Sequence, residues 1–187
     1  MTISEKVKVL KNGKKIRISS PNVEDAPSLL AFLREIYSES EYLSLYPEEI
    51  TLTEEDERKF IKQKLESKRS LFIIAKDEEG ALIATAEFVP ISEKLKIRHR
   101  ATCAIAVKQR MCNQGVGSEM MKTLLMNIHG LGFTQLELSV VEGNIRAEQL
   151  YKRLGFIKTG TIPEAFRLKS GKTLNVTNMI LFLIDYA

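Results

Sequence analysis

The stretch from Ala101 to Ser118 constrains the fold of this chain more than any other. Small and β-branched residues from Ala101 to Val107 indicate a buried strand, and a polar turn follows it. After Gly115 and Gly117, apolar residues recur at the spacing of an amphipathic helix, at Met120, Met121, Leu124, Leu125, Ile128 and Leu131. The sequence therefore predicts a strand that leads through a glycine-bearing turn into a helix.

The start of that helix is suited to binding an anion. Its first N–H groups have no partner within the helix, the helix dipole adds positive potential, and glycine lets a phosphate approach the backbone closely. Alone, Gly115 and Gly117 equally suit a helix that begins beside a close-packed strand. The pattern is not the dinucleotide fingerprint, because Met120 replaces its third glycine, and it is not a P-loop, because Gly-Lys-Ser/Thr is absent.

A second motif follows a predicted strand over Gln135 to Val141, where apolar residues alternate with polar ones. The chain continues as Asn144-x-x-Ala147-x-x-Leu150-Tyr151-x-x-Leu154-Gly155-Phe156. Together with the earlier Gln114-Gly-x-Gly117, this spacing resembles the GNAT superfamily of acyl-CoA-dependent N-acyltransferases. The resemblance covers the chain from Arg100 to its end. The N-terminal half agrees with the family only in the order of its elements.

The predicted elements form one domain, residues 1–187, because no repeat, low-complexity tract or linker divides the chain. Their order is strand or hairpin, two helices, three strands, helix, strand, helix and two strands. We expect helices at about 20–36 and 53–66, a long helix closed by Gly132, and last strands over Phe156 to Ile162 and Thr173 to Ile184. This order favours an α/β (α+β) fold with a mixed, mostly antiparallel sheet and helices on both faces.

The resemblance implies acetyl-CoA as cosubstrate. In the family the turn before the helix cradles the pyrophosphate, the preceding strand pairs with the pantetheine arm, and the neighbouring strands splay apart to admit it. Cys112 stands where the family usually has Arg or Gln, which changes one side-chain contact and leaves the backbone donors in place. The implied cofactor-binding residues are Ile105, Ala106, Val107, Cys112, Asn113, Gln114, Gly115, Val116, Gly117, Ser118, Asn144, Ala147, Tyr151 and Arg153.

Several of these residues have a second interpretation. Asn144 is also a good helix N-cap. Lys108, Arg110, Lys152 and Arg153 are candidates for the outer phosphates, or ordinary solvated cations. Cys112 is either a nucleophile or a turn residue with a free thiol, and the absence of a histidine with an obvious role beside it favours the turn residue.

Acyl transfer to an amine needs a general acid for the departing thiolate, and the resemblance assigns that role to Tyr151. The pKa of a tyrosine is close to that of a thiol, which suits the role. The alternative is a core residue, because Tyr151 shares one helical face with Ala147, Leu150 and Leu154.

The general base is predicted to be Glu87, which lies within the otherwise apolar strand from Ile83 to Val89. In a central cleft, burial raises the pKa of a carboxyl group toward a useful value; at a sheet edge the carboxylate faces solvent. Many members of the family place a glutamate on this strand to deprotonate the amine. Glu142 is the fallback.

The acceptor is an amine of a small molecule, a peptide or a protein. Between Glu35 and Glu57 the chain has nine acidic residues and neither Lys nor Arg. In the family this region walls the acceptor site, and an acidic wall favours a cationic acceptor such as a polyamine, an aminoglycoside or a peptide N-terminus. A solvated acidic loop explains the same residues.

Composition narrows the class of protein further. Hydrophobic residues make up 44% and charged residues 28% of the chain. The net charge of +4 is too small to indicate a protein that binds nucleic acid. Cys103 and Cys112 are the only cysteines and lack metal-ligand spacing, so we expect no metal. There is no apolar run of signal or transmembrane length, so we expect no membrane association and a cytoplasmic location.

The sequence thus predicts an acetyl-CoA-dependent N-acetyltransferase that acts by direct transfer, with Tyr151 and Glu87 as catalytic residues. A non-catalytic acyl-CoA-binding or regulatory module of the same fold is the alternative. A homodimer through the C-terminal strands is possible by the resemblance.

Overall fold

The computed structural model describes residues 1–183 and contains one sheet of eight strands, in the order β1-β2-β3-β4-β5-β6-β8-β7. The strands pair antiparallel except for β5 and β6, which are parallel. The mixed, mostly antiparallel sheet is therefore confirmed. The strands are β1 (Lys6–Val9), β2 (Lys15–Ser19), β3 (Leu71–Lys76), β4 (Leu82–Pro90), β5 (Arg100–Val107), β6 (Gln135–Val141), β7 (Ile157–Arg167) and β8 (Thr173–Phe182).

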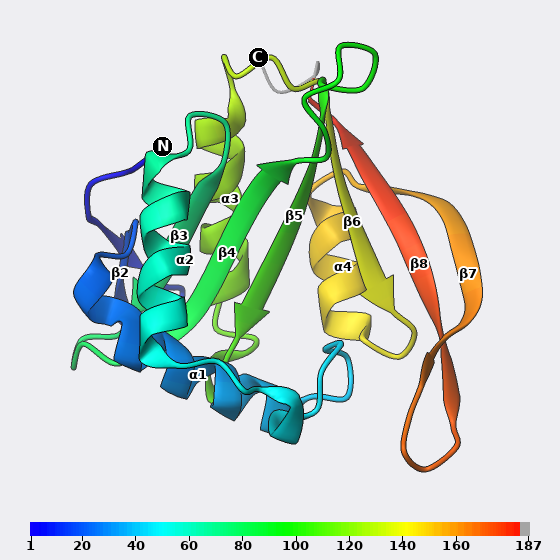
Figure 1. The fold of residues 1–187 in the computed structure, drawn as a ribbon, viewed down its shortest axis with the longest axis horizontal. Coiled ribbons are helices and arrows are strands. Elements are labelled where there is room, and N and C mark those ends of the chain that lie inside the picture. The colour runs from blue at the N-terminus through cyan, green and yellow to red at the C-terminus, as the bar shows by residue number, and fades with distance from the viewer. Residues whose placement is uncertain (184–187) are drawn as a thin grey trace.

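Helices cover both faces of the sheet, as predicted. Figure 1 shows α1 and α2 in front of the sheet and α3 behind it. Phe32 and Ile36 of α1 and Ile61 of α2 are buried against Phe72 and other residues of β3 and β4. A larger core lies between the opposite face of the sheet, α3 and α4. The helices are α1 (Ala26–Glu39), α2 (Glu54–Glu66), α3 (Val116–Ile128) and α4 (Ile145–Arg153).

Local sequence signals place several of these elements correctly. The predicted capping box at the start of α2 is present, because the Thr53 hydroxyl accepts from the Asp56 N–H at 3.2 Å and the Asp56 carboxylate accepts from the Thr53 N–H at 3.0 Å. The Asp56 carboxylate also accepts from the Thr53 hydroxyl at 2.6 Å, and this hydrogen bond, with the one from the Thr53 N–H, keeps the pKa of Asp56 below its usual value. The predicted turn at Asn12-Gly13 joins β1 to β2, with Gly13 at φ 83°.

The ends of α3 and β7 differ from the prediction. Helix α3 ends at Ile128, four residues before Gly132, and both Gly130 and Gly132 adopt positive φ. The apolar Leu131 that extended the predicted helix instead packs against the core from the loop. Strand β7 continues past Ile162 to Arg167, so β7 and β8 form a long hairpin. The end predicted for the last strand, Ile184, lies outside the described residues.

The parallel strands β5 and β6 pair only at their starts. Their register joins Arg100 to Gln135, Ala101 to Leu136 and Thr102 to Glu137, and it ends there. We call the place where the two strands separate, just after Thr102 and Glu137, the fork. The space between β5 and β6 beyond it is the open part of the fork, and its mouth lies at the carboxyl ends of the two strands. Beyond the fork β5 remains paired with β4 and β6 remains paired with β8. Figure 1 shows the two strands diverging from the fork toward their carboxyl ends.

Side chains fix the fork at its closed end. The Arg100 guanidinium donates to both Glu137 carboxylate oxygens, from Nε at 2.5 Å and from Nη2 at 2.8 Å. The Thr102 hydroxyl donates to the Glu137 carbonyl at 3.2 Å. These contacts join β5 and β6 at the last residue pair before they separate.

None of the helices described within residues 1–183 is both long and apolar enough to span a bilayer.

Candidate active site

The open part of the fork exposes backbone in the middle of the sheet. Ala104 of β5 is exposed, and Ile105, Ala106 and Val107 are only partly buried. In a parallel sheet such a central strand is normally covered and paired on both sides. The edge of β5 that faces β6 therefore offers backbone N–H and C=O groups to a third, extended chain. The structure places the predicted pantetheine-binding residues at this edge.

The turn between β5 and α3 is shaped to present donors. Asn113 and Gly115 adopt left-handed backbone conformations, with φ of 61° and 94°, and Gly115 is the N-cap of α3. Within the described part of the chain, no backbone N–H from Asn113 to Ser118 has an acceptor. Successive free N–H groups in such a turn form an anion-binding concavity. These free N–H groups make the turn a candidate for the predicted pyrophosphate site.

Gly117 lies where α3, β5 and α4 come together. A Cβ atom on Gly117 would stand 3.3 Å from Leu150 Cδ2 and 3.7 Å from Ile105 Cδ1. The first turn of α3 therefore adjoins both the open edge of β5 and the inner face of α4. At its own N-terminus α4 is capped as predicted, because the Asn144 side-chain oxygen accepts from the Ala147 N–H at 3.3 Å.

Cys112 is a turn residue in this structure. Its Sγ lies 3.6 Å from the Lys108 carbonyl and 3.9 Å from the Val107 carbonyl, as a weak donor to the preceding backbone. Partial burial raises the pKa of the Cys112 thiol, the Arg146 guanidinium lowers it and the Glu39 carboxylate raises it. A thiol whose pKa is raised carries little thiolate at neutral pH, which favours the turn-residue interpretation over a nucleophile.

The effect of Arg146 on Cys112 identifies a cation that the sequence analysis missed. Arg146 is the second residue of α4, is exposed, and forms no ion pair within residues 1–183. Its position beside the turn makes it a candidate for a phosphate contact. It occupies one of the variable positions between Asn144 and Ala147, so the motif itself gives no signal for it.

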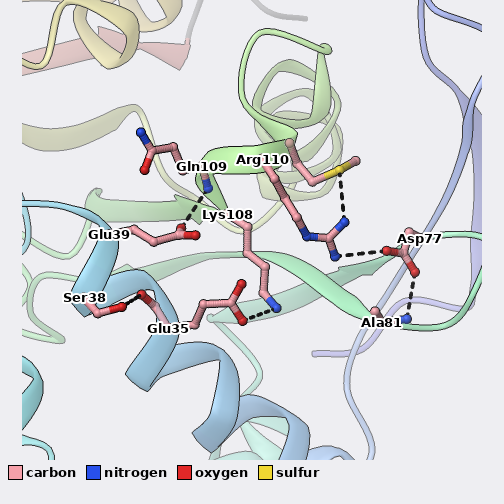
Figure 2. A network of polar contacts seen from close by, with 9 residues as sticks. Glu35, Ser38, Glu39, Asp77, Ala81, Lys108, Gln109 and Arg110 are labelled. Atoms are coloured by element: carbon pink, nitrogen blue, oxygen red, sulfur yellow. Dashed lines mark hydrogen bonds and ion pairs between the residues drawn. The ribbon is translucent and has the colours of Figure 1, made fainter.

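Most of the predicted phosphate-binding cations are engaged elsewhere. Lys108 Nζ lies 2.5 Å from the Glu35 carboxylate, and Arg110 Nη2 lies 3.2 Å from the Asp77 carboxylate; both ion pairs are drawn in Figure 2. Lys152 pairs with Glu148 within α4 at 2.7 Å. Arg153 is exposed and forms no ion pair with another described residue.

Tyr151 lies in the core with its ring 5.7 Å from that of Phe156. Burial raises the pKa of the Tyr151 phenol above its ordinary value, and the Cys103 thiol adds to the rise. Burial likewise raises the pKa of the Cys103 thiol, with a further contribution from the Glu87 carboxylate. Cys103 is the first residue of β5 beyond the fork, and these effects indicate that Tyr151 and Glu87 both lie near it.

Glu87 does not stand free in a cleft. It lies opposite Ala104 in the β4–β5 pair, on the face covered by α1 and α2. Its Oε2 atom accepts from Lys64 Nζ of α2 at 2.5 Å, and both side chains are largely buried, with exposures of 28% and 18%. The fallback, Glu142, is exposed and accepts from the Asn175 N–H at 3.3 Å. Both predicted bases thus have a partner, and Glu87 is the one beside the open strand.

The last residue of α1 and the loop that follows it cross the mouth of the fork. The Glu39 carboxylate accepts from the Gln109 N–H, just after β5, at 2.8 Å (Figure 2). Three residues later the Tyr42 hydroxyl donates to the Gly143 carbonyl, just after β6, at 3.0 Å. Gly143 has φ of 90°, and a Cβ atom there would lie 3.3 Å from the Tyr42 oxygen. Residues 39–42 therefore bridge the ends of the two diverging strands.

A groove of about 600 Å³ opens beside this bridge. One wall is the end of α1 with the loop that follows, residues 37–41 and 43–47, and the other is the β7–β8 hairpin, residues 165–170. The first wall is the region predicted to border the acceptor. The contribution of the hairpin was not predicted, because residues more than a hundred positions apart in the sequence meet here only through the fold.

Several of the acidic residues between Glu35 and Glu57 form ion pairs or are buried. Glu35 pairs with Lys108, Glu48 pairs with Lys169, and Glu54 and Glu55 pair within α2. Glu57 is buried, which raises the pKa of its carboxyl group, and Asp56 adds to that rise. Four of the nine acidic side chains in this segment are thus paired with a cation, and Glu48, Glu54 and Glu55 remain more than half exposed to solvent.

Among the described residues, no group of three or more His, Cys, Asp or Glu side chains is arranged to hold a metal ion.

The chain belongs to the acetyltransferase (GNAT) family, whose model matches residues 30–156, well over half of the sequence. The match includes the turn before α3, the fork and the motif in α4. The chain is thus a member of a family of acetyltransferases, and the resemblance seen in the sequence is confirmed. A search of curated proteins finds no match.

Solved structures agree with this assignment. The acetyltransferase of the GNAT family from Streptococcus pneumoniae is 25% identical, with a TM-score of 0.83 over 89% of this chain and 99% of that one. A GCN5-related N-acetyltransferase from Kribbella flavida is 25% identical, with a TM-score of 0.74 over 89% and 97%. YncA from Salmonella typhimurium, solved with its cofactor acetyl-CoA, shares the fold at 16% identity, with a TM-score of 0.78 over 92% and 96%.

The position of Gly117 yields a test of the anion site. We expect Gly117→Arg to weaken acetyl-CoA binding by at least about 10-fold, because the new side chain fills the space between α3, β5 and α4. Gly160→Arg is the matched control, since a Cβ at Gly160 meets nothing within 4 Å. Isothermal titration calorimetry measures both, and thermal unfolding checks that both variants fold. Wild-type affinity in Gly117→Arg would place the cosubstrate elsewhere.

Proposed function

We propose that this protein transfers an acetyl group from acetyl-CoA to a primary amine. The observation that carries the proposal is the fork, because it opens a gap in the sheet directly beside a turn of free N–H groups. The turn suits a pyrophosphate, and the open edge of β5 suits the two amides of a pantetheine arm. Acetyl-CoA supplies the activated acyl group as a thioester. The residues present fit that molecule.

The reaction is a direct transfer. The neutral amine nitrogen attacks the thioester carbonyl carbon, a C–N bond forms, the C–S bond breaks, and the sulfur leaves as the CoA thiolate. The nitrogen loses one proton and the thiolate gains one. A backbone N–H of β5 beyond the fork stabilises the oxyanion of the tetrahedral intermediate.

In this proposal Tyr151 donates a hydrogen bond, and then the proton, to the departing sulfur. Its raised pKa means that the phenol stays protonated throughout the neutral range. The same rise makes complete proton transfer less favourable than from an ordinary tyrosine. Stabilisation of the thiolate by the hydrogen bond is therefore the larger part of its role, which refines the close pKa match expected from the sequence.

Glu87 is the proposed base and acts through water. Lys64 occupies its Oε2 atom, whereas Oε1 has no hydrogen-bond partner among the described residues. The Lys64–Glu87 ion pair is also the specific observation that supports the alternative function, a non-catalytic acyl-CoA-binding module. In a non-catalytic acyl-CoA-binding module, the Lys64–Glu87 pair would simply fasten α2 to the sheet.

Tyr151→Phe tests the acid. We expect kcat to fall about 100-fold while the Kd for acetyl-CoA stays near the wild-type value, because phenylalanine keeps the packing against Phe156 and removes only the hydroxyl. CoA release, followed with a thiol reagent, measures kcat. Full activity in the variant would assign Tyr151 to the core alone.

Glu87→Gln and Lys64→Met together test the base. If Glu87 takes the proton, the first variant loses about 100-fold in kcat, and the second, which frees the carboxylate, keeps its activity. Glu142→Gln tests the fallback base in the same assay, and we expect it to keep its activity. Equal losses in Glu87→Gln and Lys64→Met, with matching losses in thermal stability, would mean that the pair is structural.

A further inference from the structure

The charges of the groove between residues 37–47 and the β7–β8 hairpin limit what it binds. This argument rests on the proposed function, because it concerns the acceptor of the same site. Two charged side chains of the groove are already engaged. Glu39 accepts from the Gln109 N–H, and Lys169 pairs with Glu48 while its ammonium lies 4.3 Å from the centre of the Tyr46 ring.

Two other charges that line the groove have no partner within residues 1–183, and they are opposite in sign. Glu41 comes from the wall after α1, and Arg167 comes from β7 in the facing hairpin. Both side chains are exposed. The groove thus presents one available carboxylate and one available guanidinium, from opposite walls.

Between them the groove has an apolar lining. Leu43 and Leu45 belong to the wall after α1, and Phe166 and Leu168 belong to the hairpin. Phe166 and Leu168 also pack against the small core around Val141, which holds the hairpin in place beside β6. A ligand with an apolar body therefore gains contact area here.

The groove also adjoins the reaction centre. Glu39 and Glu41 lie in the bridge over the mouth of the fork, which is fastened to the ends of β5 and β6 by Gln109 and Gly143. A small acceptor in the groove is thus held beside the residues that lie just after β5 and β6, Gln109 and Gly143. To a long polycation the groove offers, among the described residues that line it, one unengaged carboxylate, Glu41, and it places the Arg167 cation on the facing wall.

We propose that the acceptor is a zwitterionic amine with an apolar body, such as an apolar α-amino acid. Arg167 binds its carboxylate, a contact that a guanidinium makes with two parallel hydrogen bonds. The Glu41 carboxylate attracts the ammonium group before the amine loses its proton. The chemical step is the one described above, and the bonds formed and broken are unchanged.

Leucine and isopentylamine, which differ only in the carboxylate, test the proposal. With wild-type protein and acetyl-CoA, we expect kcat/KM to be about 10- to 100-fold higher for leucine. Spermidine, as a polycation, should be the poorest acceptor of the three. Equal or lower kcat/KM for leucine would overturn the proposal.

Arg167→Gln should remove the difference between the two acceptors by raising the KM for leucine about 10-fold or more, with little change for isopentylamine. Arg167→Lys should recover part of the preference. Lys172→Gln is the matched control, because it removes one positive charge from the same hairpin outside the groove. Selectivity that survives Arg167→Gln, or that Lys172→Gln removes equally, would contradict the assignment.

The outcome separates this inference from the proposed function. Acetylation of isopentylamine without a preference for leucine would leave the acetyltransferase function standing and reject the zwitterionic acceptor. If the chain binds acetyl-CoA but acetylates none of the three amines, the proposed function fails, and the acceptor assignment fails with it.

Discussion

The site depends on one constraint, the early end of the pairing between β5 and β6. These strands are the parallel pair of an otherwise antiparallel sheet, and their register stops after three residue pairs. A strand edge left open in the middle of a sheet is costly unless its backbone groups find other partners. Glu137 joins the strands at the last pair through Arg100 and Thr102, so the gap begins at a defined place.

The surrounding elements are placed around this gap. Helix α3 begins at the end of β5 and directs its free N–H groups beside the gap, while α4 places Tyr151 against the strand on the side of α3. On the other face, Lys64 holds Glu87 opposite Ala104. The bridge from Glu39 to Tyr42 then closes the mouth. The same opening thus relates the turn proposed to bind the pyrophosphate, the proposed acid and base, and the groove proposed to bind the acceptor.

The sequence predicted those features of the fold and the site that are encoded by residues close together in the chain. The Thr53 capping box, the Asn12-Gly13 turn and the glycine-bearing start of α3 are encoded within a few residues, and each was predicted correctly. The helix end at Ile128 was misplaced, because Gly130 and Gly132 both suit a left-handed position and Leu131 kept the apolar spacing.

Contacts between distant residues escaped prediction. Lys64 reaches Glu87 across 23 positions, and Glu39 reaches Gln109 across 70. Neither pair has a signature in the sequence, since a charged residue on a helix is usually solvated. The acidic segment from Glu35 to Glu57 suggested a cationic acceptor because its partners, among them Lys108 and Lys169, are remote in the chain. Charge within a segment therefore did not predict the charge of the groove.

The central claim is that the gap between β5 and β6 is the binding cleft for the acyl donor. A crystal structure of the chain with acetyl-CoA tests it most directly. The account predicts pyrophosphate oxygens on the N–H groups from Asn113 to Ser118, with the pantetheine arm along β5 and the thioester near Cys103 and Tyr151. Acetyl-CoA bound elsewhere, or β5 and β6 paired along their full length in the complex, would contradict it.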